Sequence, residues 1–160
     1  MTSDSHESLI IRPKSNYDLS LPSGNSVACY ALLRLYHLTQ EKKFLEVSTK
    51  IMESQAQMAA ENPFGFGFLL NTMYMYLQKP LEISILNNNN TEIVNYLTNY
   101  FLPESIMVSI NNPKQYDALS NYAFFAGKKY DSNFTSVFVC KDFTCSLPIH
   151  TTDEIKQILE

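Results

Sequence analysis

The residues best suited to chemistry in this sequence lie near its end, in the segment VCKDFTCSLPIH (139–150). Cys140 and Cys145 have four residues between them, and His150 follows five positions after Cys145. Thiolate and imidazole groups bind zinc, but a closed zinc site needs four ligands and this segment supplies only three. A redox CxxC pair keeps its thiols two residues apart at the start of a helix, which this spacing does not match. We therefore predict no metal site and no bound cofactor.

The two cysteines also have structural interpretations. A disulfide is geometrically possible across a tight turn, but it is unusual in a reducing cytosol. The interpretation that we favour from the sequence is that Cys140 ends a strand and that Cys145 packs as a small hydrophobic side chain. The odd total of three cysteines in 160 residues does not indicate a disulfide framework either.

The composition argues against several classes of partner. The net charge is −4, and no run of lysine or arginine is longer than a pair, so the basic surface of a nucleic-acid-binding protein is not expected. The acidic start MTSDSHESL lacks the pattern of a signal peptide, and no apolar run is long enough to span a membrane. We expect a cytoplasmic protein that binds neither nucleic acid nor membranes.

Apolar residues at helical spacing predict three helices before Pro80, over residues 25–38, 42–60 and 64–78. The first and third are apolar on nearly every side, which indicates burial on nearly every side, whereas the second is amphipathic. This pattern divides the chain into an N-terminal extension (1–21), a helical region (22–79) and a small α/β region (80–160).

After Pro80 the pattern changes to short strands. LEISIL (81–86) and SIMVSI (105–110) predict two strands around an amphipathic helix at 91–102, an order that favours a parallel β-α-β unit. Residues 136–140 predict a third strand. The fold class that we predict is α+β or α/β, with a helical layer followed by a small, mostly parallel, three-stranded sheet with flanking helices.

Two further segments of this region predict a turn and a helix cap, and a third shows no clear pattern. The run NNNN (87–90) predicts a turn. Thr151-Thr152-Asp153-Glu154 matches the capping box that precedes a helix, so a final helix is expected after it. Residues 111–133 show no clear pattern.

Several stretches carry a resemblance to a known family. They are RPK (12–14), PSGNS (22–26) and the Cys140/Cys145 pair. Because of these residues, the chain resembles the C-terminal end of thioredoxin-domain-containing proteins of the spermatogenesis-associated type. The resemblance implies that full-length members join a thioredoxin-like domain to an α/α barrel of the six-hairpin glycosidase and sugar-epimerase kind. It also implies that residues 22–79 are the last hairpins of such a barrel.

A barrel of this kind needs about twelve helices, so three helices cannot close it. The resemblance further implies that the helix start near residue 25 faces a sugar-binding cavity. Asp18, Ser23, Asn25 and Ser26 are then candidate substrate-binding residues. The structural alternative, in which Ser23 or Asn25 caps the helix, is favoured because such caps are common. No catalytic residue is predicted, because glycoside hydrolysis needs two acids and the local spacing supplies only Asp18.

The resemblance and the missing barrel together suggest a function. We expect a non-catalytic C-terminal module that stabilises or docks onto an α/α-barrel protein or a partner subunit. The alternative is part of an epimerase-like or glycoside-hydrolase-like carbohydrate-processing enzyme, with a carbohydrate ligand, completed by other chains. Because three helices leave apolar surface uncovered, we expect a homodimer or a complex with a barrel-bearing partner.

Overall fold

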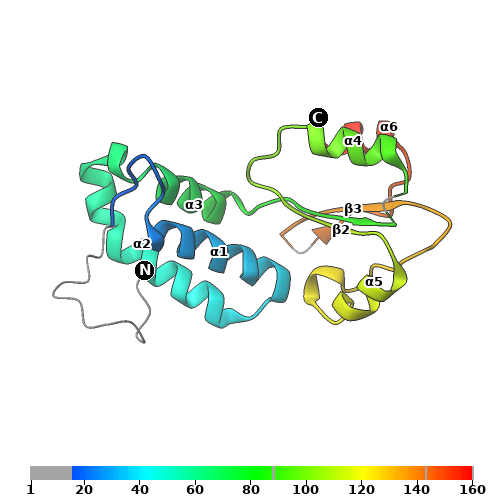
Figure 1. Ribbon diagram of the computed structural model, residues 1–160, viewed down its shortest axis with the longest axis horizontal. Coiled ribbons are helices and arrows are strands. Elements are labelled where there is room, and N and C mark those ends of the chain that lie inside the picture. Colours follow the sequence, from blue (N-terminus) through cyan, green and yellow to red (C-terminus); the bar gives the residue numbers. More distant parts are fainter. Residues whose placement is uncertain (1–15, 88, 143, 160) are drawn as a thin grey trace. The chain divides into compact units, whose positions relative to one another are not determined.

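A computed structural model describes residues 16–87, 89–142 and 144–159, and within them the chain forms six α-helices and four strands (Figure 1). The chain divides into two compact units. Of the described residues, the first unit contains those up to Tyr36 together with Glu41–Leu77, and the second contains His37–Gln40 and those from Gln78 onward. Each unit is described by itself. The fold is therefore a mixture of helix and strand, as the sequence predicts.

The first unit is helical. Its elements are α1 (Gly24–Thr39, whose last residues belong to the second unit), α2 (Lys42–Glu61), the one-turn 3₁₀ helix η1 (Pro63–Gly65) and α3 (Gly67–Gln78). The first two match the predicted helices closely. The third begins three residues later than predicted, because Pro63–Gly65 forms the 3₁₀ turn instead. The core of this unit is built by residues of the three α-helices and by Phe66, which lies between η1 and α3: Cys29, Met52, Ala59, Phe66 and Leu69.

The prediction that the apolar helices are buried on nearly every side is wrong. In α1 the buried residues are Ser26, Cys29 and Leu33, while Val27 and Leu35 are exposed. A group of three helices covers only the sides that face one another, so apolar residues on the remaining sides stay in contact with water.

A pair of small buried residues joins α1 to α2. The hydroxyl of Ser48 donates a hydrogen bond of 3.0 Å to the carbonyl oxygen of Cys29, and the two side chains lie 3.3 Å apart at Oγ and Sγ. Burial raises the pKa of the Cys29 thiol, although the contact with Ser48 opposes this. A buried neutral thiol of this kind packs as a small apolar group, which explains its place in the core.

The second unit is built on a four-stranded sheet. Its strands are β1 (Glu82–Leu86), β2 (Ile106–Ile110), β3 (Ser136–Lys141) and β4 (Thr144–Cys145), in the order β2-β1-β3-β4. Its helices are α4 (Thr91–Asn99), α5 (Pro113–Leu119), the 3₁₀ turn η2 (Ala123–Phe125) and α6 (Thr152–Leu159). The predicted β-α-β unit is confirmed, because β1 and β2 are parallel neighbours.

The prediction of a mostly parallel, three-stranded sheet is wrong in two respects. The short strand β4 adds a fourth member, and both β1–β3 and β3–β4 are antiparallel pairs. The reason lies in the connection after β2, which brings the chain back to the end of the sheet at which β1 finishes. Asn87, just after β1, donates from its side chain to the carbonyl oxygens of Asp131 and Phe134, just before β3. A strand that starts beside the last residue of β1 must run in the direction opposite to β1.

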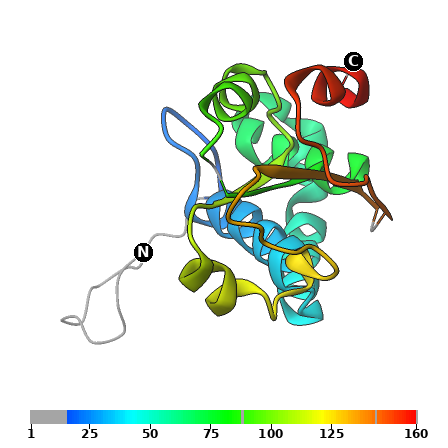
Figure 2. The ribbon, with the colours of Figure 1, turned by 90° about the vertical axis from the view of Figure 1, so that its right-hand side faces the viewer.

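Helices α4 and α6 lie side by side over one face of this sheet, as Figures 1 and 2 both show, and α5 lies on the other side. The core between the sheet and the two helices is apolar: Ile83, Ile85, Ile93, Leu97, Val137, Val139, Ile149 and Ile155. The period-two alternation in β1 sends Ile83 and Ile85 to this face.

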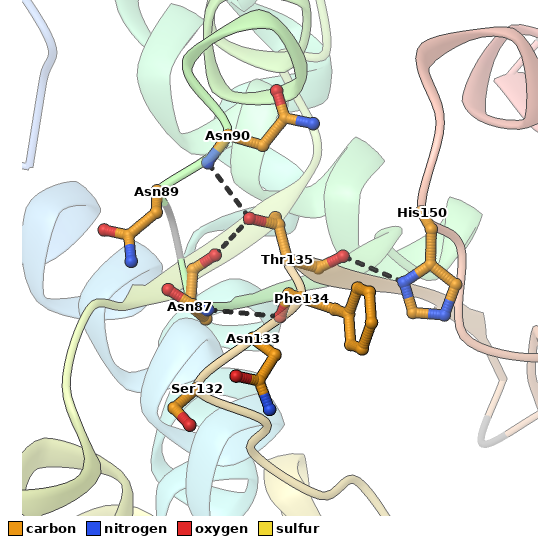
Figure 3. A pocket seen from close by; sticks show the side chains of 8 residues that line it. All are labelled: Asn87, Asn89, Asn90, Ser132, Asn133, Phe134, Thr135 and His150. Carbon is orange, nitrogen blue, oxygen red and sulfur yellow. Dashed lines mark hydrogen bonds between the residues drawn. The ribbon is translucent and has the colours of Figure 1, made fainter.

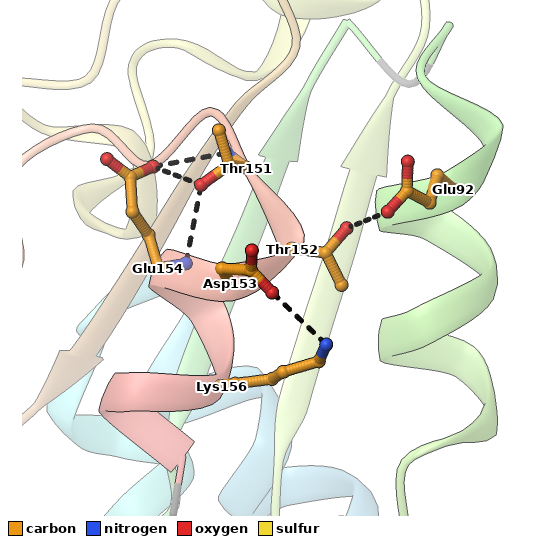
Figure 4. A network of polar contacts seen from close by, with 6 residues as sticks. All are labelled: Glu92, Thr151, Thr152, Asp153, Glu154 and Lys156. Carbon is orange, nitrogen blue, oxygen red and sulfur yellow. Dashed lines mark hydrogen bonds and ion pairs between the residues drawn. The ribbon is translucent and has the colours of Figure 1, made fainter.

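The start of α6 is held by the predicted capping box (Figure 4). The backbone N–H of Glu154 donates to the Thr151 hydroxyl at 3.3 Å, and the Glu154 carboxylate accepts from the backbone N–H of Thr151 at 3.1 Å. The Thr152 hydroxyl also donates to the Glu92 carboxylate of α4 at 2.8 Å. These contacts fix the first turn of α6 beside the first turn of α4.

The other face of the sheet covers a buried lysine, which was not predicted from the sequence. Lys128 is only 4% exposed, and its ammonium donates to the carbonyl oxygen of Phe124 at 2.6 Å. It also lies 4.6 Å from the centre of the Phe124 ring. Burial lowers the pKa of Lys128, and the charge of Glu82 opposes this change.

Candidate functional site

Ser23 is the cap of α1. Its hydroxyl accepts a hydrogen bond of 3.1 Å from the backbone N–H of Ser26, and its carbonyl oxygen accepts one of 3.0 Å from Val27. The hydroxyl groups of Ser23 and Ser26 are 2.8 Å apart, within hydrogen-bond distance. This geometry is that of a helix N-cap, in which a serine side chain satisfies an N–H group of the first turn.

Asp18 binds two backbone N–H groups at once. One carboxylate oxygen accepts from Ser23 at 2.7 Å, and the other accepts from Leu69, in the first turn of α3, at 3.0 Å. The side chain is 7% exposed. Burial by itself raises the pKa of Asp18, but the hydrogen bonds from the Ser23 and Leu69 N–H groups and from the Ser26 hydroxyl outweigh it, so the pKa lies below its usual range.

The segment around Asp18 is also held by its backbone and by a ring contact. The backbone N–H of Asp18 donates to the carbonyl oxygen of Gly65 at 2.8 Å. The centre of the Tyr17 ring lies 5.1 Å from the centre of the Phe66 ring. A β-carbon on Gly65 would lie 2.7 Å from the Tyr17 ring, so a larger residue there would force the ring to move. Asp18 thus joins the start of α1 to the start of α3.

The structure brings together three of the four candidate substrate-binding residues, Asp18, Ser23 and Ser26, in one buried network. Asn25 lies beside it, and its side-chain amide donates to Asn16 at 2.7 Å. The groups that would bind a sugar already bind one another, so their role as a sugar site stays a prediction. Leu69 could not be predicted as a partner of Asp18, because the two residues are 51 positions apart in the chain.

Cys140 and Cys145 form a disulfide, with their Cα atoms 4.0 Å apart. They are paired residues of the antiparallel strands β3 and β4, which places their side chains next to each other. The prediction that Cys145 packs as a small hydrophobic side chain is wrong, because this residue is exposed. The pairing could not be predicted from the spacing of the two cysteines, because a strand of only two residues leaves no pattern in the sequence that shows its register.

His150, the third residue of the alternative metal site, has a different partner. Its Nδ1 lies 2.9 Å from the carbonyl oxygen of Thr135, and its ring packs edge-on near Phe134. A carbonyl oxygen only accepts, so Nδ1 carries a proton in this contact. Within the described part of the chain, no three histidine, cysteine or acidic residues form a group that could hold a metal ion.

We expect the purified protein to contain less than about one-tenth of an equivalent of zinc, because the disulfide occupies both thiols. Thiol titration in denaturant should detect Cys29 alone before reduction and all three cysteines after it. Metal analysis and thiol titration check this on one sample. Stoichiometric zinc that is lost, together with stability, in Cys140→Ser would contradict it.

A pocket of about 330 Å³ lies at the carboxyl end of β1 (Figure 3). It is lined by side chains from the turn after β1, the segment before β3 and the segment before α6: Asn87, Asn89, Asn90, Ser132, Asn133, Phe134, Thr135 and His150. The asparagine run was predicted as a turn. The pocket could not be predicted from the sequence, because the residues of its other wall lie more than forty positions further along the chain. Described residues that line it include no carboxylate, lysine or arginine.

Comparisons with known proteins give one set of relatives. The chain is 19% identical over 155 residues to spermatogenesis-associated protein 20 from Homo sapiens, and to the same degree to the proteins of that name from Mus musculus and Rattus norvegicus. The aligned part covers 94% of this chain. These matches support a relation to that family. No family model and no solved structure matches the chain.

The chain spans about a fifth of the length of the curated relatives that it matches. Of the motifs that carry the resemblance, Arg12-Pro13-Lys14 lies outside the described residues, whereas 22–26 forms the cap of α1 and the cysteines form the disulfide. In the described part of the chain, no helix combines the length and the apolar character needed to cross a membrane.

Proposed function

We propose that this chain is a non-catalytic module that docks onto, and stabilises, an α/α-barrel-bearing protein. The observation that carries the proposal is the unequal coverage of the match, which includes 94% of this chain but 20% of the human relative. A segment that corresponds to so small a share of a larger protein is expected to pack against other parts of such a protein.

The surface that we propose for docking is the outer face of α3, formed by the exposed side chains of Tyr74 and Leu77. Their spacing places them on the side of the helix away from the buried residues Leu69, Thr72 and Met75, while Leu70 and Met73 beside them are partly buried against the core. Leu77 is 72% exposed and Tyr74 is 48% exposed. A continuous apolar stripe of this kind fits the groove between two helices of an apolar partner.

Photo-crosslinking from this face tests the proposal. A benzophenone amino acid in place of Tyr74 is expected to capture a polypeptide with helical-hairpin repeats in cells of the source organism. The same group in place of Asn71, an exposed polar residue of α3, is the matched control and should capture much less. Capture of only a second copy of this chain, or no difference between the two positions, would count against the proposal.

The alternative, part of a carbohydrate-processing enzyme, stays a prediction from the resemblance. The hydrogen-bonding groups at the start of α1 do not favour it, because Asp18 and Ser23 already accept from backbone N–H groups. The cytoplasmic location stays a prediction from sequence features, and the Cys140–Cys145 disulfide, which would be unusual in a reducing cytosol, does not favour it.

A further inference from the structure

The disulfide between β3 and β4 joins a buried residue to an exposed one. Cys140 is 1% exposed, whereas Cys145 lies exposed on the edge strand β4. A thiolate opens a disulfide by attacking one of its two sulfur atoms, so access decides which of them is attacked. The remaining cysteine, Cys29, is fully buried in the first unit. Cys145 is therefore the position at which an external thiol can reach the bond.

The chain after Cys145 is held to β3 without the disulfide. The backbone N–H of Ser146 donates to the carbonyl oxygen of Val139 at 2.9 Å, and the Ser146 hydroxyl accepts from the N–H of Val139 at 3.2 Å. Val137 and Ile149 exchange two backbone hydrogen bonds of 2.9 Å, and Ile149 is buried. These contacts would keep the two thiols of a reduced chain close together, so the bond can form again.

The turn between β3 and β4 has few other constraints. Among its described residues, Lys141 and Thr144 form the one ladder pair beyond the cysteines, and both are exposed. Asp142 accepts from the ammonium of Lys79 at 2.6 Å, but the two side chains are 54% and 55% exposed, and ion pairs in contact with water contribute little. The disulfide is thus the main constraint on this turn.

The fold of the second unit depends little on this bond. The two cysteines have only four residues between them, and the stabilisation from a cross-link is smallest when the closed loop is short. The apolar core between the sheet and the helices α4 and α6 contains neither cysteine. Reduction is therefore expected to loosen the turn and to leave the sheet folded.

We propose that the Cys140–Cys145 disulfide is a reversible redox switch, which a thiol reductant opens at Cys145 to release the turn between β3 and β4. Its residues belong to the second unit alone, so the switch is independent of the proposed docking surface on α3.

The exchange runs in two steps. The thiolate of the reductant attacks Cys145 Sγ, the bond between the cysteines breaks, and its electron pair goes to the sulfur of Cys140, which takes a proton from water. A second thiol then attacks the reductant's sulfur in the mixed disulfide and releases Cys145. The chain gains two electrons and two protons, and the two reductant thiols become a disulfide.

Equilibration of the native full chain with mixtures of reduced and oxidised glutathione tests reversibility. After an acid quench and alkylation in denaturant, oxidised chains should carry one alkyl group, on Cys29, and reduced chains three. The reduced fraction is expected to follow the glutathione ratio along one curve, from whichever form the titration starts. A bond that stays closed at every ratio until denaturant is added, or that does not form again, would overturn the proposal.

Single-cysteine reactivity tests the point of attack. Cys140→Ala leaves the exposed Cys145 thiol, and Cys145→Ala leaves the buried Cys140 thiol. The first should react with Ellman's reagent about 100-fold faster or more, because access and burial set thiol reactivity. Peptide mapping of the first glutathione adduct on the wild-type chain checks the same point without a substitution, and glutathione should be on Cys145. Equal rates, or an adduct on Cys140, would contradict the assignment.

Amide hydrogen exchange of the oxidised and reduced chains tests what the switch releases. The amides of Lys141 and Thr144 are expected to exchange about tenfold faster or more after reduction, because the turn then opens locally. The amides of Val137 and Ile149 are the matched controls in the same pair of segments and should not change. Unchanged exchange in the turn would show that no switch exists there, and faster exchange at all four positions would show a bond that the whole unit needs; either result would overturn the proposal.

Discussion

Asp18→Asn is expected to lower the free energy of unfolding by about 3 kcal/mol at neutral pH. The carboxylate accepts from the N–H groups of Ser23 and Leu69 through its two oxygens. Asparagine has one oxygen, so its amide nitrogen would face one of these donors and leave it buried without a partner. Chemical denaturation followed by circular dichroism at pH 7 measures the effect.

The pH dependence of this effect distinguishes it from a simple packing change. The folded-state pKa of Asp18 is lowered, so its contribution is fully present above the unfolded pKa, near 4, and is lost as pH falls through the folded value. The difference between the wild-type protein and Asp18→Asn should therefore shrink as the pH is lowered below about 4. Asp117→Asn, at an exposed position of α5, is the control and should change stability little. A difference that stays constant down to pH 2 would contradict the assignment.

The isolated chain is expected to form a dimer with a mass near twice 18.3 kDa at micromolar concentration. Without its proposed partner, the outer face of α3 is left in water, and a two-fold contact between copies is the commonest way to cover such a surface. Leu77→Glu places a charge at a residue of this face that is 72% exposed, and it should weaken the dimer by about 100-fold or more. Light scattering combined with size-exclusion chromatography measures the mass.

Asn71→Glu adds the same charge to the same helix at an exposed polar position, so it should leave the mass unchanged. A monomeric wild-type protein, with both variants folded and also monomeric, would mean that the outer face of α3 does not drive association. The docking proposal would then lose its surface, whereas the relation to the larger proteins would remain.

Features set by neighbouring residues could be predicted from the sequence. The Thr151/Glu154 capping box is complete within four residues, and the helices α1 and α2 follow from local apolar spacing. The parallel β1–β2 pair also followed, because a helix between two strands usually produces it.

Features that depend on distant residues could not be predicted. The direction of β3 depends on where the connection from β2 returns, and residues 111–133 carry no regular pattern that shows this. Asp18 binds Leu69 across 51 residues, and the wall of the pocket opposite the asparagine turn lies more than forty residues from that turn in the chain. Asp18, Ser23 and Ser26 are close together in the sequence, but only the structure shows that they bind one another.

The position of β1 between β2 and β3 has a consequence for the order of folding during synthesis. β2 and α4 follow β1 closely, so the ribosome supplies the parallel partner first. The other partner comes much later, since Ser136 follows its paired residue Leu86 by 50 positions. Until then, one edge of β1 is open, and Ile83 and Ile85 lack the cover of Val137 and Val139. An open edge beside exposed isoleucines is prone to pair with another chain. The arrival of β3 therefore completes the core and also ends the period in which the nascent chain is exposed to aggregation.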